Sequence, residues 1–332
     1  MQYNELIEKY DKGNMLALMR EFPDQCKLAI GIAKKYPLNF SEKCENIFIQ
    51  GMGGSGIGGA ITRDLLKQIC KVPIVVGNSY ELPAFVDKKT LAFFVSYSGN
   101  TEETIAAFKE ARKKKAIAIC VSSNGMLAKM CRSCIKVPAG NLPRTMLAFL
   151  SLPQIIIIER LGLLKKPLMF EQLPEFLRRE VKNAENIGKR LAERLYGQIP
   201  VLYAGESYSA LVWRIHGQLA ENSGMFSHCN VLPEMNHNEI VGFKPSEKNL
   251  TFLFFRTDDE SAQMMKRFAF TKNVVSKKSK VYEIRLKGRS NLERMFYGIM
   301  IGDFMSYYLA LLNGKDPSEN KNITKLKKIL AR

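Results

Sequence analysis

The glycine-rich segment at residues 51–59 constrains the fold of this chain more than any other feature. It contains six glycines in nine residues and follows directly on an apolar run at residues 46–50. Glycine lets the backbone turn tightly and approach an anion, and the free N–H groups and the dipole of a following helix favour negative charge. We therefore predict a strand, then a phosphate-binding turn containing Gly54 and Ser55, then a helix.

The same segment also satisfies the G-x-G-x-x-G pattern of dinucleotide-binding folds, at Gly51, Gly53 and Gly56. That fold needs an acidic residue at the end of the following strand, where it binds the ribose hydroxyls. Here the next apolar run ends in Gly-Asn-Ser at residues 77–79, and the first acidic residue after it is Glu81. The sequence therefore favours a phosphate site without a dinucleotide.

A second predicted turn carries a cluster of hydroxyl groups. The apolar run at residues 91–95 is followed by Ser96, Ser98 and Thr101, and Thr101 is a good candidate for a helix N-cap. A single hydroxyl in such a place is usually a plain cap. Two such turns at the carboxyl ends of two strands of one sheet can instead converge on one phosphate. The hydroxyls that we expect to bind it are those of Ser55, Ser96, Ser98 and Thr101.

Short apolar runs alternate with helix-length segments in both halves of the chain, which is the pattern of parallel sheets covered by helices. We predict strands at residues 46–50, 73–77, 91–95, 116–121, 201–204, 249–255 and 281–284. The fold class is therefore α/β, with two doubly wound domains that each have a mainly parallel sheet flanked by helices. The expected boundaries are a first domain at 1–163, a linker and connecting helix at 164–198, a second domain at 199–315 and a C-terminal helix at 316–332.

The charge and the apolar pattern limit the partners of the chain. Its formal charge of +18 attracts phosphorylated metabolites and nucleic acid alike. Lysines and arginines are spread along the sequence, however, without the interleaved aromatic residues that stack on bases. The longest apolar stretch, at residues 146–158, contains Pro153 and is too short to cross a bilayer. We expect no nucleic-acid partner and no membrane association.

The cysteines and the N-terminus indicate a cytoplasmic protein. Seven cysteines are an odd number, which argues against a secreted disulfide framework. Cys131 and Cys134 form a C-x-x-C motif, but no second Cys or His pair lies at a zinc-ribbon distance. Residues 1–20 mix charged and apolar positions and do not resemble a signal peptide. We expect reduced thiols and no metal site.

Five segments together resemble the archaeal-type bifunctional phosphoglucose/phosphomannose isomerases, which are built from two sugar isomerase (SIS) domains. They are the two turns at 51–59 and 96–104, Pro143-Arg144, Glu-Asn-Ser-Gly at 221–224, and Pro-Glu-Met-Asn-His-Asn-Glu-Ile-Val-Gly at 233–242. The similarity spans residues 45–330 in order. It implies two SIS-type domains and reversible conversion of glucose 6-phosphate, and often mannose 6-phosphate, to fructose 6-phosphate. It also implies a homodimer that needs no metal ion or other cofactor.

The resemblance implies a role for each matching residue. Gly54 and the hydroxyls of the two turns would bind the substrate phosphate. Arg144 would stabilise negative charge on the enediolate, and Glu221 would be the base that moves the proton. His237 would open the sugar ring and would reach the active site from the neighbouring subunit.

The chemistry of isomerisation fits these residue types. A single carboxylate within reach of two adjacent carbons can remove a proton from one and return it to the other. A guanidinium supplies fixed positive charge for the developing oxyanion, and an imidazole exchanges protons with sugar oxygens near neutral pH. Asn236 and Asn238 flank His237 in a polar loop suited to orienting its ring, whereas His216 and His228 lack such neighbours. We expect His216 to pack beside Trp213.

The C-terminus departs from the family pattern, which places a lysine and a hydroxyl near the substrate on the final helix. We expect that helix to begin at residues 316–318 and the lysine to be Lys327 or Lys328. The candidates for the hydroxyl or polar position are Ser318, Asn320 and Thr324. The sequence does not choose among them.

Two other functions remain open at the level of the sequence. One is a sugar-phosphate-responsive regulator, since single SIS domains act as sensors, but residues 1–45 are short for the helix-turn-helix module that a regulator needs. The other is an isomerase or deaminase for another sugar phosphate.

Overall fold

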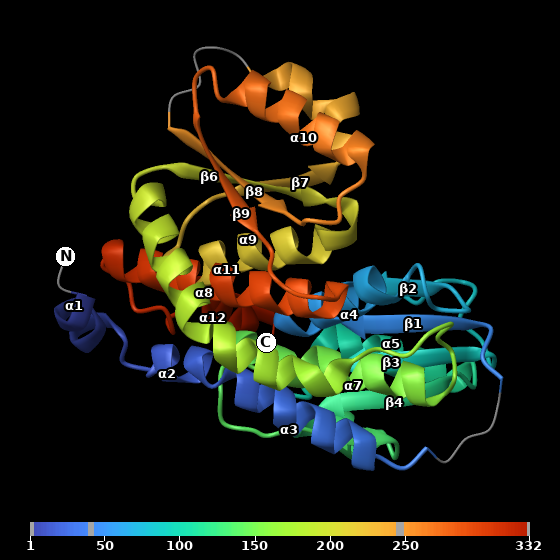
Figure 1. The fold of residues 1–332 in the computed structure, drawn as a ribbon. Helices are drawn as coiled ribbons and strands as arrows, with labels where there is room; N and C mark the ends of the chain where they lie inside the picture. The colour runs from blue at the N-terminus through green and yellow to red at the C-terminus, as the bar shows by residue number, and fades with distance from the viewer. Residues whose placement is uncertain (1–2, 39–42, 244–248, 331–332) are drawn as a thin grey trace. The chain divides into compact units, whose positions relative to one another are not determined.

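The computed structural model describes residues 3–38, 43–243 and 249–330, and the chain forms two compact units (Figure 1). The N-terminal unit comprises Glu21–Arg178 with Arg289–Glu293. The C-terminal unit comprises Met1–Arg20, Arg179–Gly288 and Arg294–Arg332. Each unit has one parallel sheet flanked by helices, which confirms the predicted α/β class.

The sheet of the N-terminal unit has the strand order β2-β1-β3-β4-β5, and all neighbouring strands are parallel. The strands are β1 (Asn46–Gly51), β2 (Ile74–Gly77), β3 (Thr90–Val95), β4 (Ile117–Ser122) and β5 (Cys134–Lys136). β1 lies between β2 and β3, and its register pairs Gly51 with Val95. The turns that follow β1 and β3 therefore begin side by side. Open α/β sheets bind ligands at such a switch point, outside the carboxyl ends of the strands.

Helices cover both faces of this sheet. They are α3 (Phe22–Lys35), α4 (Gly53–Leu66), α5 (Glu102–Lys113), α6 (Gly125–Met130) and α7 (Leu147–Arg160). Residues 147–158 of α7 are all buried, because this helix packs against both α3 and α4. A Cβ atom on Gly58 would lie 2.4 Å from the carbonyl oxygen of Leu150, so glycine permits the close approach of α4 and α7.

The sheet of the C-terminal unit has the strand order β7-β6-β8-β9, again parallel throughout. The strands are β6 (Ile199–Gly205), β7 (His228–Leu232), β8 (Leu250–Arg256) and β9 (Lys280–Arg285). The helices wholly in this unit are α1 (Tyr3–Tyr10), α2 (Met15–Arg20), α9 (Ser209–Ser223), α10 (Ala262–Val275) and α12 (Lys321–Leu330). The unit also contains most of α8 (Leu173–Leu195) and of α11 (Asn291–Leu312).

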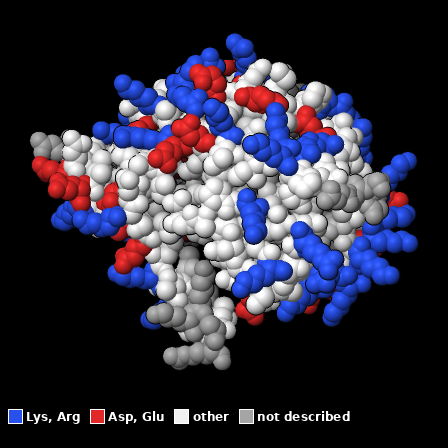
Figure 2. Space-filling view, turned by 90° about the horizontal axis from the view of Figure 1, so that it is seen from below, with Lys and Arg blue, Asp and Glu red and all other residues white. Residues whose placement is uncertain are grey.

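Within the described residues, α11 is the one helix long and apolar enough to cross a membrane, and 89% of its most apolar window is buried. The core helix of a soluble protein has the same properties. α11 packs against α9 through glycine: a Cβ atom on Gly302 would lie 2.4 Å from Cγ1 of Ile215. On the face shown in Figure 2, lysine and arginine side chains are scattered among acidic and neutral ones.

All seven predicted strands are present, but three features differ from the expectation. Two strands were not predicted: β5 has only three residues, and β7 begins with the polar residues His228, Cys229 and Asn230. The final helix begins at Lys321 instead of residues 316–318. Asp316 closes a turn there, because its Oδ1 accepts hydrogen bonds from the backbone N–H and the hydroxyl of Ser318.

Candidate active site

The two hydroxyl-bearing turns of the N-terminal unit contact each other. Ser55 lies in the first turn of α4, is 6% exposed, and accepts a hydrogen bond of 3.3 Å at its Oγ from the backbone N–H of Tyr97. Tyr97 belongs to the turn after β3. This contact brings Ser55 to the hydroxyl cluster that the sequence predicts.

Ser96 and Thr101 form the core of the second turn. Their hydroxyl oxygens are 2.8 Å apart, and Ser96 is fully buried. Thr101 is the N-cap residue of α5, as predicted, but its side chain makes no capping hydrogen bond to that helix. Ser98 is exposed, and its Oγ accepts a hydrogen bond from the N–H of Asn100. The amide groups at the start of α5 are therefore not occupied by the side chain of their own cap.

The first turn depends on glycine for its shape. Gly53 opens α4 with a φ of +51°, and the cap residue before it, Met52, makes no side-chain capping bond. A Cβ atom on Gly56 would lie 2.6 Å from the carbonyl oxygen of Gly51. Only glycine at position 56 leaves the backbone this compact, and the N–H groups of Ser55 and Gly56 close the turn by donating to the carbonyl oxygen of Met52 at 3.0 and 3.1 Å.

The loop after β4 packs against the second turn and forms hydrogen bonds with its backbone. Gly99 has a φ of +69°, and a Cβ atom there would lie 1.7 Å from the carbonyl oxygen of Asn124. The N–H of Leu127 donates to the carbonyl oxygen of Gly99 at 2.8 Å, and the hydroxyl of Ser123 donates to that of Tyr97 at 2.6 Å. These bonds fix the backbone that carries Ser96 and Ser98.

Arg144 lies next to the first turn. It is 3% exposed and belongs to the 3₁₀ helix η1 (Pro143–Thr145). A Cβ atom on Gly54 would lie 3.4 Å from the carbonyl oxygen of Pro143 and 3.5 Å from the Cα of Arg144. The N-terminal unit thus gathers Gly54, Ser55, the second turn and Arg144 at one end of its sheet.

Glu221 lies in the C-terminal unit, in the last turn of α9. Its side chain is half-buried, and Nδ2 of Asn320 lies 3.5 Å from its Oε2. Nζ of Lys315 donates to its backbone carbonyl oxygen at 2.6 Å. Gly224 follows with a φ of +66° and ends the helix in the left-handed conformation.

A buried polar ladder fixes α9 on α11. Arg214, Gln218 and Asn222 lie one turn apart along α9. Asp303 of α11 pairs with Nη2 of Arg214 at 3.0 Å and accepts a bond of 2.9 Å from Nε2 of Gln218. Asn222 donates to the hydroxyl of Ser306 at 2.9 Å. These contacts fix the position of α9 along α11, and with it the position of Glu221 in the last turn of α9.

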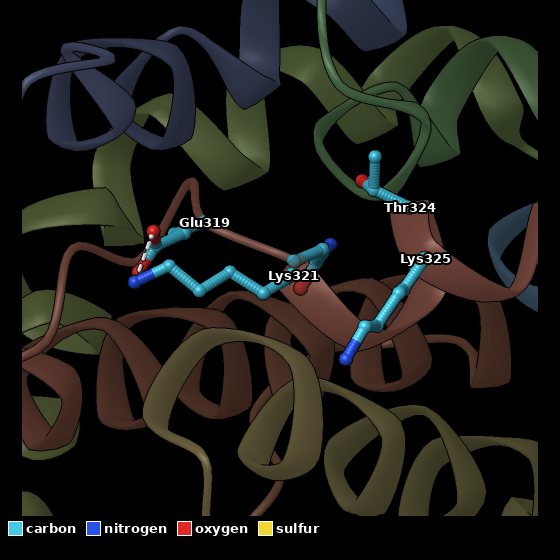
Figure 3. A pocket seen from close by; sticks show the side chains of 5 residues that line it. Glu319, Lys321, Thr324 and Lys325 are labelled. Atoms are coloured by element: carbon cyan, nitrogen blue, oxygen red, sulfur yellow. Dashed lines mark ion pairs between the residues drawn. The ribbon is translucent and has the colours of Figure 1, made fainter. Parts of the chain in front are cut away.

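A cavity of about 290 Å³ opens beside Asn320 (Figure 3). It is lined by Glu319, Asn320, Lys321, Thr324 and Lys325. Lys321 turns toward Glu319 and forms an ion pair of 2.8 Å with it, whereas Lys325 and Thr324 project from α12. Asn320 therefore links the two features, because it lines this cavity and its Nδ2 lies 3.5 Å from Oε2 of Glu221.

His237 is exposed at the end of the 3₁₀ helix η4 (Glu234–His237). The two flanking asparagines do not bond to its ring. Asn236 donates to the hydroxyl of Thr271 on α10 at 2.8 Å, and Asn238 donates to Oε1 of Glu234 at 2.9 Å. They therefore anchor the loop that carries the imidazole, which differs from the predicted role of orienting the ring.

The other two histidines are not simple packing residues. Nε2 of His228 lies 2.8 Å from Oε1 of Glu239, and this hydrogen bond raises the pKa of His228. Nδ1 of His216 lies 2.8 Å from Oγ of Ser227, while burial lowers the pKa of His216. The ring of His216 also meets that of Trp213 edge to face, as expected. His228 has no flanking asparagine in the sequence, and its carboxylate partner comes instead from the loop after β7.

Comparison with known proteins identifies the family. A sequence model of the SIS domain matches residues 42–158, and a model described as the bacterial phospho-glucose isomerase C-terminal SIS domain matches residues 184–330. A bifunctional phosphoglucose/phosphomannose isomerase of Caldicellulosiruptor bescii is 35% identical over 96% of this chain and 99% of its own length. One of Thermoplasma volcanium is 35% identical over 87% of this chain and 92% of its own. The chain belongs to the bifunctional phosphoglucose/phosphomannose isomerase family.

Solved structures support the same fold for this family member. The C-terminal domain of glucosamine-fructose-6-phosphate aminotransferase from Francisella tularensis matches with a TM-score of 0.72 and 17% identity. The match covers 92% of this chain and 98% of that one. At this identity the likeness concerns the arrangement of helices and strands alone.

The expected C-terminal residues of this phosphoglucose/phosphomannose isomerase family member fall in different places. Asn320 and Thr324 line the cavity, whereas the hydroxyl of Ser318 donates to Asp316 in the preceding turn. Lys327 and Lys328 lie on α12, but their side chains are outside the described part of the structure.

Two residues of this region of the C-terminal unit were not predicted from the sequence. Lys325 lines the cavity, and Lys315 contacts the backbone of Glu221. The signal for Lys325 would have been its spacing from Lys321, because residues four apart lie on one face of a helix. No sequence signal marks Lys315, since its partner lies 94 residues earlier.

Proposed function

We propose that this protein interconverts glucose 6-phosphate and mannose 6-phosphate with fructose 6-phosphate, by moving a proton between the first two sugar carbons without a metal ion. The observation that carries the proposal is the relative from Caldicellulosiruptor bescii, which bears both activities in its name and aligns over almost the whole of both chains. The clusters around Ser55 and Glu221 supply the chemistry that the reaction needs.

The substrate phosphate binds to the two turns of the N-terminal unit in this proposal. Ser55, Ser96, Ser98 and Thr101 offer hydroxyl donors, and Gly54 lets the backbone approach the anion. The starts of α4 and α5 add backbone amides that no capping side chain occupies. Oriented N–H groups and helix dipoles favour a dianion without a metal ion.

Glu221 is the proposed base. It removes the proton from C2 of the aldose to give an enediol intermediate and returns it to C1 to give the ketose, so one carboxylate serves both steps. Its half-buried position and its contact with Asn320 hold the carboxylate in a defined orientation. A base placed in this way contributes about 10² to 10⁴ to the rate.

Arg144 and His237 complete the proposed chemistry. The guanidinium of Arg144 stabilises the negative charge that develops on the enediolate oxygens, and it cannot be deprotonated at working pH. His237 exchanges a proton with the ring oxygen and opens the sugar. We place a lysine of α12, Lys327 or the cavity residue Lys325, near the same oxygens.

The proposed assembly is a homodimer in which His237 comes from the neighbouring subunit. The exposed position of His237 on an anchored loop suits a residue that acts outside its own chain. The odd number of cysteines, all present as free thiols, suits the reducing cytoplasm. The proposed functional domains are residues 1–163 and 199–315.

The decisive experiment mixes the purified protein with fructose 6-phosphate and follows glucose 6-phosphate and mannose 6-phosphate separately. We expect both products, with rates unchanged by a chelator. Glu221→Gln should lower kcat at least about a hundredfold while the thermal midpoint stays within a few degrees. Failure of the wild type to form either aldose would reject the function, and full activity of Glu221→Gln would reject the base.

A further inference from the structure

The carboxylate of Glu239 is the centre of a hydrogen-bond cluster that the reaction scheme leaves unused. Glu239 opens the 3₁₀ helix η5 (Glu239–Gly242), two residues after His237. Its Oε1 accepts from the hydroxyl of Tyr203 on β6 and from Nε2 of His228 on β7, the latter at 2.8 Å. Its Oε2 accepts from Nδ2 of Asn230 on β7 at 2.5 Å. Three donors from two strands therefore converge on one loop side chain.

Hydrogen bonds stabilise the ionised form of Glu239, although partial burial of the carboxylate disfavours that form. Burial alone would raise the pKa of Glu239, but the hydrogen bonds from His228, Tyr203 and Asn230 outweigh it and hold that pKa below its usual value. Tyr203 is fully buried in the centre of the sheet. An ionised group with every donor in place rigidifies the segment that carries it.

The segment so fixed is the backbone on both sides of His237. On one side, Asn236 is tied to Thr271 of α10. On the other, Oδ1 of Asn238 accepts a bond of 2.5 Å from the backbone N–H of Glu239, whose side chain is tied to the sheet. The imidazole itself remains exposed. The loop therefore presents an exposed imidazole on a backbone that is tied to α10 on one side and to the sheet on the other.

We propose that Glu239 is a positioning residue for His237, which anchors the loop to β6 and β7 so that the imidazole is presented in one orientation. The proposal rests on the ring-opening role assigned to His237 above. It assigns to Glu239 no contact with the substrate.

The kinetic test compares Glu239→Gln with a matched control, Glu234→Gln, on fructose 6-phosphate. Gln at position 239 keeps one acceptor but loses the charge that His228 pairs with. Gln at 234 keeps an acceptor for its single donor, Asn238. We expect kcat to fall about tenfold in Glu239→Gln with KM within about twofold, and both values to stay within about twofold in Glu234→Gln.

A double substitution separates positioning from general destabilisation. If Glu239 acts through His237, then Glu239→Gln adds no further loss of kcat in a His237→Ala background. Equal losses in both backgrounds would overturn the proposal. Tyr203→Phe removes a different donor from the same carboxylate and should reproduce part of the effect, should Glu239→Gln fold poorly.

A spectroscopic test does not depend on turnover. The chain has three histidines, so imidazole-labelled protein gives three resolvable sets of NMR signals. We expect the signals of His237 to shift or broaden in Glu239→Gln and Tyr203→Phe but not in Glu234→Gln. Unchanged His237 signals in both variants would overturn the positioning role. Absence of isomerisation in the wild type would instead reject the proposed function. The NMR result alone would then decide whether Glu239 anchors the loop that carries His237.

Discussion

Nζ of Lys315 donates a hydrogen bond of 2.6 Å to the backbone carbonyl oxygen of Glu221. The last carbonyls of a helix have no partner within it, and a cation placed there also complements the helix dipole. Asn313 caps the same end, because its Nδ2 donates to the carbonyl oxygen of Ser223 at 3.0 Å. The carboxylate proposed as the base is thus carried on a helix end that two side chains hold in place.

Replacing Lys315 should therefore weaken both stability and catalysis. We expect Lys315→Met to lower the free energy of unfolding by about 1 kcal/mol, because the bond and the dipole interaction are lost. We expect kcat to fall severalfold, since the last turn of α9 frays and Glu221 loses its fixed position. Denaturant titration and steady-state kinetics measure the two effects.

Lys12 provides the matched control for that substitution. Its Nζ donates 2.9 Å to the backbone carbonyl oxygen of Glu8, at an exposed helix end that carries no proposed site residue. Lys12→Met should change stability by less than about 0.5 kcal/mol and leave kcat unaltered. A similar loss of kcat in both variants would show that Lys315 does not act through Glu221.

The second phosphate turn should not tolerate a side chain at Gly99. Alanine there would adopt a φ of +69° and place its Cβ 1.7 Å from the carbonyl oxygen of Asn124, so the backbone must move. We expect Gly99→Ala to cost more than about 2 kcal/mol of stability and to raise KM for fructose 6-phosphate. Thermal unfolding and initial rates measure the two effects.

Gly140 provides a control that separates the cost of a positive φ from the cost of steric overlap with a new Cβ atom. It has a φ of +100°, but no atom lies within 4 Å of the position that a Cβ atom would take there. Gly140→Ala should therefore cost only about 1 kcal/mol and leave KM unchanged. Equal losses of stability in the two variants would mean that the loop after β4 moves to accommodate a methyl group at position 99.

The sequence specified the parts of this site that are local in the chain. The order of strand, glycine turn and helix at residues 46–66, and the hydroxyls before α5, follow from backbone and capping preferences that act over a few residues. These rules placed Ser55 and Thr101 correctly at the starts of two helices. The neighbouring position of the two turns followed from the parallel sheet, because the carboxyl ends of its strands share one edge.

The contacts that cross long stretches of chain could not be predicted in this way. Tyr203 meets Glu239 across 36 residues, and Asn320 meets Glu221 across 99. Such pairs depend on the packing of whole elements. The shift of the final helix to Lys321 shows the same limit, because the turn closed by Asp316 forms where the helix was expected to begin.

Removing a phosphate-binding hydroxyl should change binding more than turnover. Ser96 is fully buried beside Thr101, and its proposed contact with the phosphate is the same in substrate and transition state. We expect Ser96→Ala to raise KM about tenfold with kcat within about threefold.

Ser261 is the matched control for the Ser96 substitution. Its Oγ caps α10 by accepting from the N–H of Met264, a purely structural task. Ser261→Ala should cost about 1 kcal/mol of stability and leave KM as in the wild type. An unchanged KM in Ser96→Ala would remove that hydroxyl from the phosphate site.

The ion pair of His228 and Glu239 predicts a pH dependence of stability. The pKa of His228 is raised above its ordinary 6.5, so its contribution is fully present below pH 6.5 and is lost as the pH rises through the raised value. The pKa of Glu239 is lowered below its ordinary 4.5, so its contribution is present above pH 4.5 and is lost as the pH falls through the lowered value. The pair therefore stabilises most between these two limits.

Comparison of the wild type with His228→Gln tests this window. The side chain of His228 is 48% exposed, so the difference in unfolding free energy should stay below about 1 kcal/mol. We expect the difference to be largest near pH 5.5 and to disappear by pH 9, measured by urea titration at each pH. A difference that does not vary with pH would mean that the pair is held by packing and not by charge.

The lysine of α12 that serves the reaction can be identified by paired substitutions. Lys325 lines the cavity beside Asn320, the residue that contacts the carboxylate of Glu221, and its ammonium would stabilise negative charge on a sugar oxygen bound there. We expect Lys325→Met to lower kcat on both aldoses by at least about tenfold and Lys327→Met to lower it less than twofold. Met keeps the length of the side chain and the helix propensity at both positions, so the thermal midpoints should agree within a few degrees. The reverse order of the two losses would assign the role to Lys327. It would also mean that the face of α12 that meets the substrate is not the face that lines the cavity.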